Sequence, residues 1–485
     1  MIAEENSLKR LLDRRKIPVL WEIAMKKLKD FEFHNIKTRH IQWFCLVLVG
    51  LLELFTMVFG ATVDGPMRGY VVFYETLAGI LFFGVSIRET MSRKGRNLLL
   101  LGLGFCLWTL LLQLSDYRHY SPTAYYGARF IFSAFFCEYL MLLPCAAILD
   151  EGEKAVGLKI LGGFYAAAIV AYLGLTVLLY LDRIPTVFSR FCGWINVRLG
   201  INWHPNIMGQ ALSITIGFGL ALVCGAKKLR SRIALGALTA VACWLLALTN
   251  ARATTLFTCC IFGGIAFYFV WSPGTDRATA LRFFLGLLAA AAVIGALFSL
   301  SGWAAKANSR YLTRVETQEL EVNTDYADGR IRDLSEDFWS FNGRTEIWAD
   351  AAQGLRDHPE VLISGVKDPG EFISQYYEDG VAHAHNSWLQ TLLRLGIVGL
   401  GFALVLTVLA IRDCIQLMFL KKSTLMQKVI CMQVICLLGS EFFEPYLFYA
   451  EAPYNFINAA FLVCLGYLEY WNYRAEPISG KERNA

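Results

Sequence analysis

Residues 342–400 read NGRTEIWADAAQGLRDHPEVLISGVKDPGEFISQYYEDGVAHAHNSWLQTLLRLGIVGL, and this stretch decides how the rest of the chain is interpreted. Its first part is polar but has apolar side chains at helical spacing before a proline stop, at Ile347, Trp348, Ala351, Ala352 and Leu355. Its last part, from His385-Asn386-Ser387 onward, runs directly into an apolar helix. The stretch therefore predicts a polar loop that brings arginine and histidine side chains to the mouth of a membrane helix.

The rest of the chain is apolar enough to cross a membrane many times. The mean hydropathy of the whole 485-residue chain is +0.46. Hydrophobic residues make up 56% of it and charged residues only 18%, and the charges are bunched between apolar runs. A helix needs roughly 20 apolar residues to cross a hydrocarbon core of ~30 Å. We therefore predict an all-α polytopic membrane protein with about twelve transmembrane helices, near residues 41–60, 70–87, 98–114, 129–149, 155–181, 205–226, 231–249, 252–271, 279–300, 388–411, 427–443 and 454–472.

The positive charges predict how these helices are oriented. Lys and Arg gather in the loops after the second, sixth, eighth and tenth crossings, for example at Arg93, Lys227 and Lys421, and the acidic loop at 150–154 is the one exception. The positive-inside rule then places both termini in the cytoplasm and the longest loop outside. We divide the chain into a basic cytoplasmic segment (1–40), helices 1–9 (41–300), a large extracytoplasmic loop containing short helices (301–387), helices 10–12 (388–472) and a cytoplasmic tail (473–485).

Several functional classes are disfavoured by what the sequence lacks. Most of the 13 cysteines lie in apolar runs and none form a C-x-x-C pair, so neither a disulfide framework nor structural zinc is expected. No His/Cys/Asp cluster has metal-ligand spacing, and no P-loop or G-x-G-x-x-G motif is present, so we predict no metal and no nucleotide. The net charge of +5 reflects cytoplasmic Lys and Arg rather than a nucleic-acid surface. No cleavable signal peptide is visible ahead of the first crossing.

Two arginines stand where they could bind an anion. Arg252 begins the eighth crossing on the outer side, where a helix N-terminus offers free N–H groups and the positive end of its dipole. With its guanidinium fork, this end would suit a phosphate or pyrophosphate at headgroup level. Arg344 opens the loop helix, and Arg356 further along is a candidate substrate-binding residue. Alternatively, Arg252 snorkels to lipid phosphates and Arg344 is a solvated loop arginine.

His385 is the candidate base. It precedes Asn386-Ser387, whose residue types fit a helix cap, and so it lies at the membrane-facing edge of the loop. A neutral imidazole there could accept a proton from a sugar hydroxyl. The alternative is a capping or packing histidine, and His383 is a rival for the same role. We take His383 and Asn386 as candidate substrate-binding residues.

A second polar motif, His204-Pro205-Asn206, lies at the outer start of the sixth crossing. His204 and Asn206 are candidate substrate-binding residues, although the motif could be only a helix start with proline at its first position. Carboxylates form a looser set. Some lie within crossings, where they usually face the bundle interior, and others flank the last outer loop and could contact sugar hydroxyls: Glu53, Glu75 and Glu138, then Glu441, Glu444 and Glu451.

These motifs resemble the O-antigen ligase and O-antigen polymerase superfamily of bacterial envelope glycosyltransferases. The resemblance rests on Arg252 and on the motifs H-P-N-I-M-G (204–209), N-G-R-T-E-I-W (342–348), D-H-P (357–359) and H-N-S-W-L-Q-T-L-L-R-L-G-I-V-G-L (385–400). It covers roughly residues 200–400. The sequence departs from the usual pattern at 359–370, where a longer segment replaces the short step from His-Pro to a Gly-x-Gly turn.

The resemblance implies a multi-pass enzyme of the bacterial plasma membrane that needs no cofactor. It would move a glycan from an undecaprenyl-pyrophosphate carrier onto an acceptor hydroxyl at the outer face. Arg252 and Arg344 would contact the donor pyrophosphate, and His385 would lie near the acceptor or leaving group. The acceptor could be a glycan, a lipid or a wall polymer, so polymerase and ligase both stay open. A flippase or chain-length regulator could be a partner, besides membrane lipids.

Two other classes of function remain as alternatives. A chain with twelve crossings could be a polytopic secondary transporter or a polysaccharide exporter. A transporter should show related halves and broken or charged helices near mid-bilayer, whereas the distinctive charges here lie at the outer boundary. A catalytically idle scaffold for envelope assembly is the third interpretation.

Overall fold

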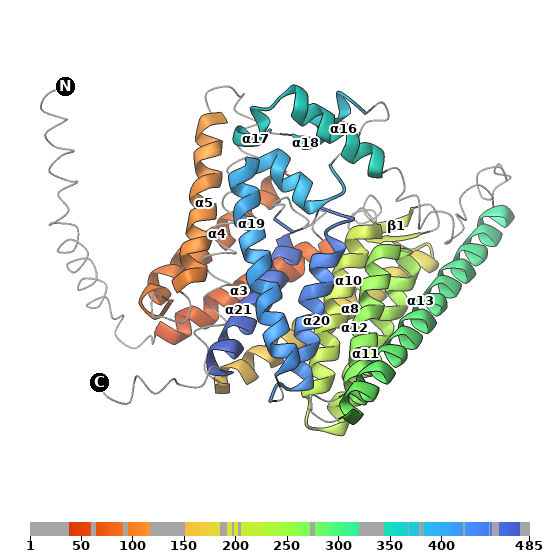
Figure 1. Ribbon diagram of the computed structural model, residues 1–485. Coiled ribbons are helices and arrows are strands. Elements are labelled where there is room, and N and C mark those ends of the chain that lie inside the picture. The colour runs from red at the N-terminus through yellow and green to blue at the C-terminus, as the bar shows by residue number, and fades with distance from the viewer. Residues whose placement is uncertain are drawn as a thin grey trace, which may run out of the picture.

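The computed structural model is a bundle of long helices with a layer of short helices across one end (Figure 1). It describes residues 38–59, 65–90, 96–116, 151–184, 192–195, 198–201, 205–271, 277–319, 344–366, 368–377, 381, 383–420, 422–445, 447–448 and 455–475. The bundle contains α3 (Thr38–Phe59), α4 (Gly65–Thr90), α5 (Arg96–Asp116), α8 (Glu151–Tyr180), α10 (Pro205–Gly225), α11 (Leu229–Thr249), α12 (Arg252–Val270), α13 (Arg277–Glu319), α19 (Ser387–Phe419), α20 (Leu425–Ser440) and α21 (Asn455–Ala475).

The bundle helices correspond in position to the predicted crossings. In the described part of the chain, 7 helices are long and apolar enough to span a membrane, and they lie in α3, α8, α10, α11, α12, α13 and α19. Shorter apolar helices lie in α4, α5, α20 and α21. The predicted crossing at 129–149 lies outside the described residues, as do the basic segment 1–37 and the tail from 476. The chain is a mostly helical protein with several candidate membrane spans.

Helix α10 is at the centre of the bundle. It packs against α8, α11, α12, α20 and α21. Of the residues in its apolar, membrane-length stretch, 78% are buried inside the protein. Helix α13 is much less buried than α10. Only 6% of the residues in its apolar stretch are buried, and it runs along the outside of the bundle against α11 and α12 (Figure 1). Its 43 residues extend for roughly 65 Å. The helix therefore continues to Glu319, well beyond the crossing predicted at 279–300.

A small hairpin departs from the all-α prediction. Strands β1 (Cys192–Ile195) and β2 (Arg198–Ile201) pair antiparallel, with Cys192 opposite Ile201. Leu199 and Ile201 are fully buried, and β2 packs against α10 and α11. Because each strand has only 4 residues, the sequence pattern is too short to separate it from a loop. The hairpin fixes Arg198 beside the start of α10.

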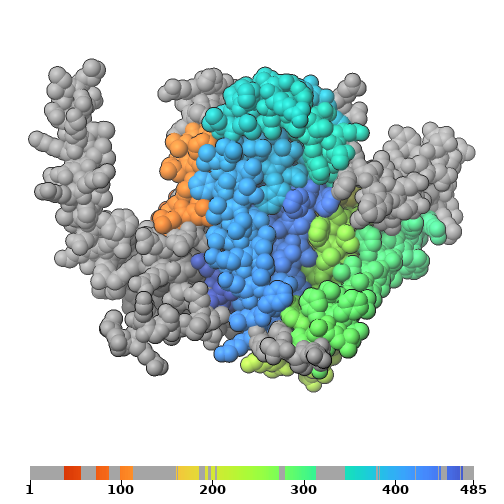
Figure 2. All heavy atoms as spheres, in the orientation of Figure 1, coloured from red at the N-terminus to blue at the C-terminus, as the bar shows by residue number. Residues whose placement is uncertain are grey.

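The short helices form a cap, which we define as α16 (Arg344–Asp357), α17 (Val361–Ser364) and α18 (Pro369–Ser374). Figure 2 shows the cap covering one end of the bundle above α19. The predicted loop helix is confirmed as α16, and its apolar face joins a separate buried cluster with members of α18 and α19, including Ile347, Ala351, Phe372, Ile373 and Leu393. We call the covered end of the bundle the cap end.

Helix α19 is broken beneath the cap at Gly396, which has a φ of 65°. The break brings backbone against backbone, because a Cβ added at Gly396 would lie 2.4 Å from the Ile363 carbonyl oxygen of α17. Two donors satisfy carbonyls near the break: Val366 N donates to Leu393 O at 2.6 Å and Trp108 Nε1 donates to Leu395 O at 2.8 Å. The cap is thus seated directly on the broken helix.

Candidate active site

The segment before α19 carries the predicted base on a tightly fixed backbone. His385 has a left-handed φ of 49°. Asn386 is the N-cap of α19, and its Oδ1 accepts a hydrogen bond from Leu389 N at 2.9 Å, as the sequence predicted. Trp348 of the cap donates from Nε1 to the Ala384 carbonyl at 2.9 Å. Both the cap and the bundle therefore hold the His385 backbone.

The loop after α20 is fastened beneath this segment by Glu441. The Ser387 N–H donates to the Glu441 carbonyl at 2.9 Å, and the Ser387 hydroxyl donates to the Glu441 carboxylate. Leu447 N donates to the same carboxylate at 2.7 Å. Glu441 is fully buried. Its carboxylate therefore orders the loop, and both of these hydrogen bonds are internal to the protein, whereas the sequence pattern predicted a contact with sugar hydroxyls.

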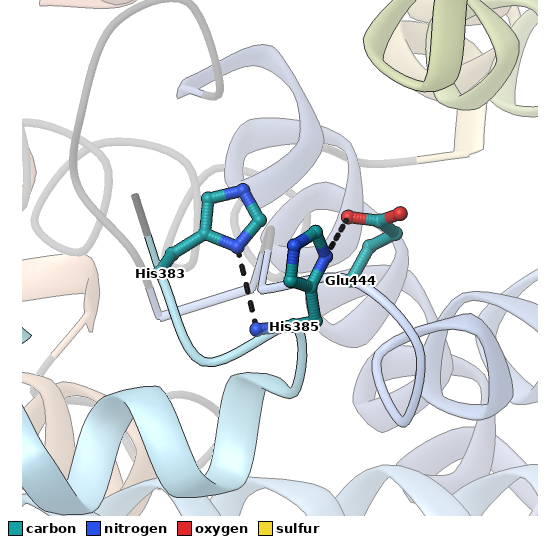
Figure 3. Close-up of side chains that lie close together, drawn as sticks. All are labelled: His383, His385 and Glu444. Atoms are coloured by element: carbon teal, nitrogen blue, oxygen red, sulfur yellow. Dashed lines mark hydrogen bonds and ion pairs between the residues drawn. The ribbon is translucent and has the colours of Figure 1, made fainter. Parts of the chain in front are cut away.

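Glu444, in the same loop, is the centre of the site. Its Oε1 accepts hydrogen bonds from Arg344 Nη2 and from Asn206 Nδ2, each at 2.7 Å. Its Oε2 lies 3.4 Å from His385 Nδ1 (Figure 3). The Glu444 side chain is only 7% exposed, whereas that of His385 is 31% exposed. Three candidate residues from distant parts of the sequence thus converge on one buried carboxylate.

The surroundings of Glu444 keep it ionised. Burial alone would raise its pKa, but the contact with His385 and the charges of Arg344, His385 and His383 outweigh burial and lower the pKa to about 2. A carboxylate beside His385 Nδ1 favours the tautomer with hydrogen on that nitrogen, which leaves a lone pair on Nε2. The arrangement can therefore present a proton acceptor next to a fixed guanidinium.

A second arginine and the start of α12 lie at the same end of the bundle. Arg198 Nη2 donates to Asn206 Oδ1 at 2.6 Å, and its Nε donates to the Thr249 carbonyl at 2.9 Å. This carbonyl belongs to the last residue of α11, three positions before Arg252. A Cβ added at Gly209 of α10 would lie 2.6 Å from Ala251 Cβ. The turn that carries Arg252 is therefore packed against the first turns of α10, near Asn206.

The middle of the chain matches a known protein family. Residues 235–404 match the protein family described as O-antigen ligase. This match supports a similarity between the middle of the chain and the O-antigen ligase/polymerase superfamily. No curated protein matches the chain. The matched segment contains Arg252, Arg344 and His385, but it ends before Glu444 and begins after Asn206. The O-antigen ligase match and the polar site thus coincide only in part, and the site draws on segments at both sides of the match.

Of the remaining predicted site residues, some lie close to His385, one lies away from the cluster, and others fall outside the described residues. His383 is next to His385, with ring centroids 4.2 Å apart, and its Nδ1 accepts a hydrogen bond from His385 N at 3.3 Å. Asn386 also donates from Nδ2 to the Phe442 carbonyl at 3.3 Å. Arg356 is exposed in the last turn of α16, at the opposite end of that helix from Arg344, so it is not part of the cluster. His204 lies outside the described residues, and so do Glu138 and Glu451.

Sequence reasoning missed the central role of Glu444. The sequence pattern places Glu444 among three carboxylates that flank the last loop, and nothing in it distinguishes Glu444 from the other two. Its partner Asn206 is 238 positions away in the chain, so only the packing of α10 against α20 brings the two side chains together. His383, His385 and Glu444 also gather three ligand-type atoms within 4.8 Å of one another. We predicted no metal-ligand cluster from the spacing of residues along the chain. That spacing could not reveal a group whose third member, Glu444, is distant in the sequence from the two histidines.

Proposed function

We propose that this protein transfers a glycan from an undecaprenyl-pyrophosphate carrier to an acceptor hydroxyl at the extracytoplasmic face of the bacterial plasma membrane. The observation that carries the proposal is the convergence of Arg344 and His385 on Glu444 at the cap end. A cationic group and a proton acceptor side by side are what transfer from a pyrophosphate leaving group requires. Arg252 at the start of α12 adds a helix N-terminus at the same end.

The reaction needs charge stabilisation more than covalent chemistry. The acceptor oxygen attacks the anomeric carbon, the bond from that carbon to the pyrophosphate oxygen breaks, and the bonding electrons leave with the carrier pyrophosphate. Arg344 uses one nitrogen for Glu444, so its other N–H groups can bind the leaving group. Donors of this kind contribute roughly 10²–10³ in rate when they act on developing negative charge. Arg252 would bind the same pyrophosphate from the α12 side.

His385 would take the proton of the acceptor hydroxyl. In this proposal Nδ1 faces Glu444, and Nε2 receives the proton as the new glycosidic bond forms. A positioned base is worth roughly 10²–10⁴ in rate. The positive imidazolium that results is stabilised by the Glu444 carboxylate, which stays ionised because its pKa is about 2. His383 and Asn206 would help to orient donor or acceptor sugars.

Transfer activity in membranes tests the proposal. Arg252→Ala, Arg344→Ala and His385→Ala are each expressed, and their expression and thermal unfolding are compared with the wild type. We expect each variant to lose at least about 100-fold in transfer from lipid-linked glycan. Wild-type turnover in all three variants would refute the proposed site.

The acceptor is tested separately by the glycans of a deletion strain. Single repeat units would identify a lost polymerase, because chains would no longer grow on the carrier. Long carrier-linked chains would identify a lost ligase, because finished chains would no longer leave the carrier. Complementation with the wild-type chain, but not with His385→Ala, should restore the normal product in either case.

A further inference from the structure

We propose that His383, His385 and Glu444 form a binding site for a divalent transition-metal ion such as Zn²⁺, and that metal binding there inhibits transfer. The three side chains come from the segment before α19 and the loop after α20, and the His385 ring lies between the His383 ring and the Glu444 carboxylate (Figure 3). Each offers one ligand atom, and these atoms all lie within 4.8 Å of one another. The inhibitory half of the inference rests on the proposed function, whereas the binding half does not.

The spacing between His385 and Glu444 fits two ligands of one metal ion. His385 Nδ1 is buried, and it lies 3.4 Å from Glu444 Oε2. That distance exceeds the usual 2.7–3.2 Å of an N–H···O hydrogen bond. By contrast, two ligand atoms about 2.1 Å from a tetrahedral zinc ion lie roughly 3.4 Å apart. An ion between the two atoms would give both a partner at ordinary bonding distance.

The donor set selects a class of metal. Two imidazoles and one carboxylate are ligands of Zn²⁺ and the neighbouring transition metals, whereas Mg²⁺ and Ca²⁺ prefer oxygen ligands throughout. Three protein ligands leave a fourth position for water, as in open zinc sites. The site is also held before any ion arrives, because Asn386 caps α19 directly after His385, and the Ser387 N–H donates to the carbonyl of Glu441, three residues before Glu444.

Arg344 sets the limit on affinity. It occupies Oε1 of Glu444 and leaves Oε2 facing the histidines. Its positive charge repels a second cation, so we expect weaker binding than at a closed structural zinc site. A reversible site of this kind would act as an inhibitor, because a metal on His385 ties the imidazole to the ion and crowds the place where the acceptor hydroxyl would approach.

Cobalt binding to the purified full-length protein tests the site without reference to activity. Co²⁺ in a tetrahedral site with nitrogen and oxygen ligands absorbs visible light, and Zn²⁺ should displace it. We expect His383→Gln and Glu444→Gln to weaken this binding at least about tenfold. His358→Gln is the matched control, because His358 is an exposed histidine 3.1 Å from Glu360 and lies outside the cluster. Thermal unfolding without metal shows whether each variant is folded.

Equal Co²⁺ binding by the wild type and folded His383→Gln would overturn the site. In the second arm, Zn²⁺ is added to the transfer assay and then removed with a chelator. We expect reversible inhibition, with at least about tenfold more Zn²⁺ needed for half-inhibition of His383→Gln. Activation by Zn²⁺ would overturn the inhibitory role. Binding that depends on His383 in a protein without transferase activity would support the site and refute the proposed function, so the two failures are distinguishable.

Discussion

At the scale of single residues, Glu444 determines how the candidate groups are arranged. Its two carboxylate oxygens contact Arg344, Asn206 and His385, and it is nearly inaccessible to solvent. A buried carboxylate is costly unless it is paired and hydrogen-bonded, so the three partners and the carboxylate depend on one another. Truncating any one of them to alanine should therefore affect both stability and the proposed activity.

The stability contributed by Glu444 should depend on pH. Its pKa in the folded protein is about 2, below the ordinary value of 4.5, so its contribution is full above about pH 4.5 and declines as the pH falls toward 2. We expect wild type to unfold at a higher temperature than Glu444→Gln at pH 6, and this gap to narrow steadily between pH 5 and about pH 3. A gap that is constant over this range, measured in detergent, would show that Glu444 is not held ionised by its partners.

Arg344→Lys tests whether the guanidinium shape matters beyond its charge. Lysine keeps the positive charge but has no planar fork that can hold Glu444 and a phosphate oxygen together. We expect transfer to fall roughly 100-fold while thermal unfolding changes little. Arg230→Lys is the control, because Arg230 is an exposed arginine at the far end of the bundle. If Arg344→Lys transfers glycan as fast as Arg230→Lys does, the guanidinium of Arg344 does not need to hold Glu444 and a phosphate oxygen at the same time.

At the scale of elements, the broken helix α19 joins the cap to the bundle. Gly396 and Gly365 both have positive φ values, 65° and 66°, and each packs against a carbonyl of the other segment. This contact fixes where α17 sits, and α17 in turn supports the cap core that holds α16 and Arg344. The break at Gly396 therefore helps to position Arg344 through α17 and the cap core.

Gly396→Ala should be strongly destabilising, whereas Gly401→Ala in the same helix should not. A methyl group at Gly396 would meet Ile363 O at 2.4 Å, while nothing lies within 4 Å of the corresponding position at Gly401. A left-handed non-glycine residue alone costs about 1–3 kcal/mol. Thermal unfolding of the two variants measures the difference. Equal stabilities would show that α17 does not rest on the break.

The sequence predicted the elements whose signal is local. Long apolar runs identified the bundle helices, and the residue types Asn386-Ser387 identified the start of α19, because both signals lie within a few turns. The hairpin β1–β2 and the continuation of α13 to Glu319 were missed. A 4-residue strand has no usable period, and the helix beyond residue 300 is too polar to be recognised by hydropathy.

At the scale of the whole molecule, the candidate site is where the sequence was least sufficient. Residue types at the starts of two helices, the loop helix and the apolar helix after it, indicated Arg344 and His385, and the structure brings both to one carboxylate. Their common partner was not identifiable, because Glu444 is 100 positions from Arg344 along the chain. Such pairing depends on how α10, α19 and α20 pack, which single-sequence patterns do not encode. The catalytic roles stay predictions.

The orientation of the bundle is also a prediction, and it can be measured in intact cells. Glu371→Cys places an exposed thiol on the cap, and Arg230→Cys places one at the start of α11, near the opposite end. If the cap faces outward, a membrane-impermeant maleimide should label Glu371→Cys above the wild-type background but not Arg230→Cys. The reverse pattern would place the candidate site in the cytoplasm and contradict the proposed donor.

Binding of undecaprenyl pyrophosphate to the purified protein tests the central claim most directly. In our proposal Arg344 and Arg252 bind the pyrophosphate, and His385 accepts the proton of the acceptor hydroxyl. Arg344→Ala and Arg252→Ala should therefore bind labelled carrier at least about tenfold more weakly than the wild type. His385→Ala should bind like the wild type yet transfer no glycan. Equal binding by folded wild type and both arginine variants would contradict the account.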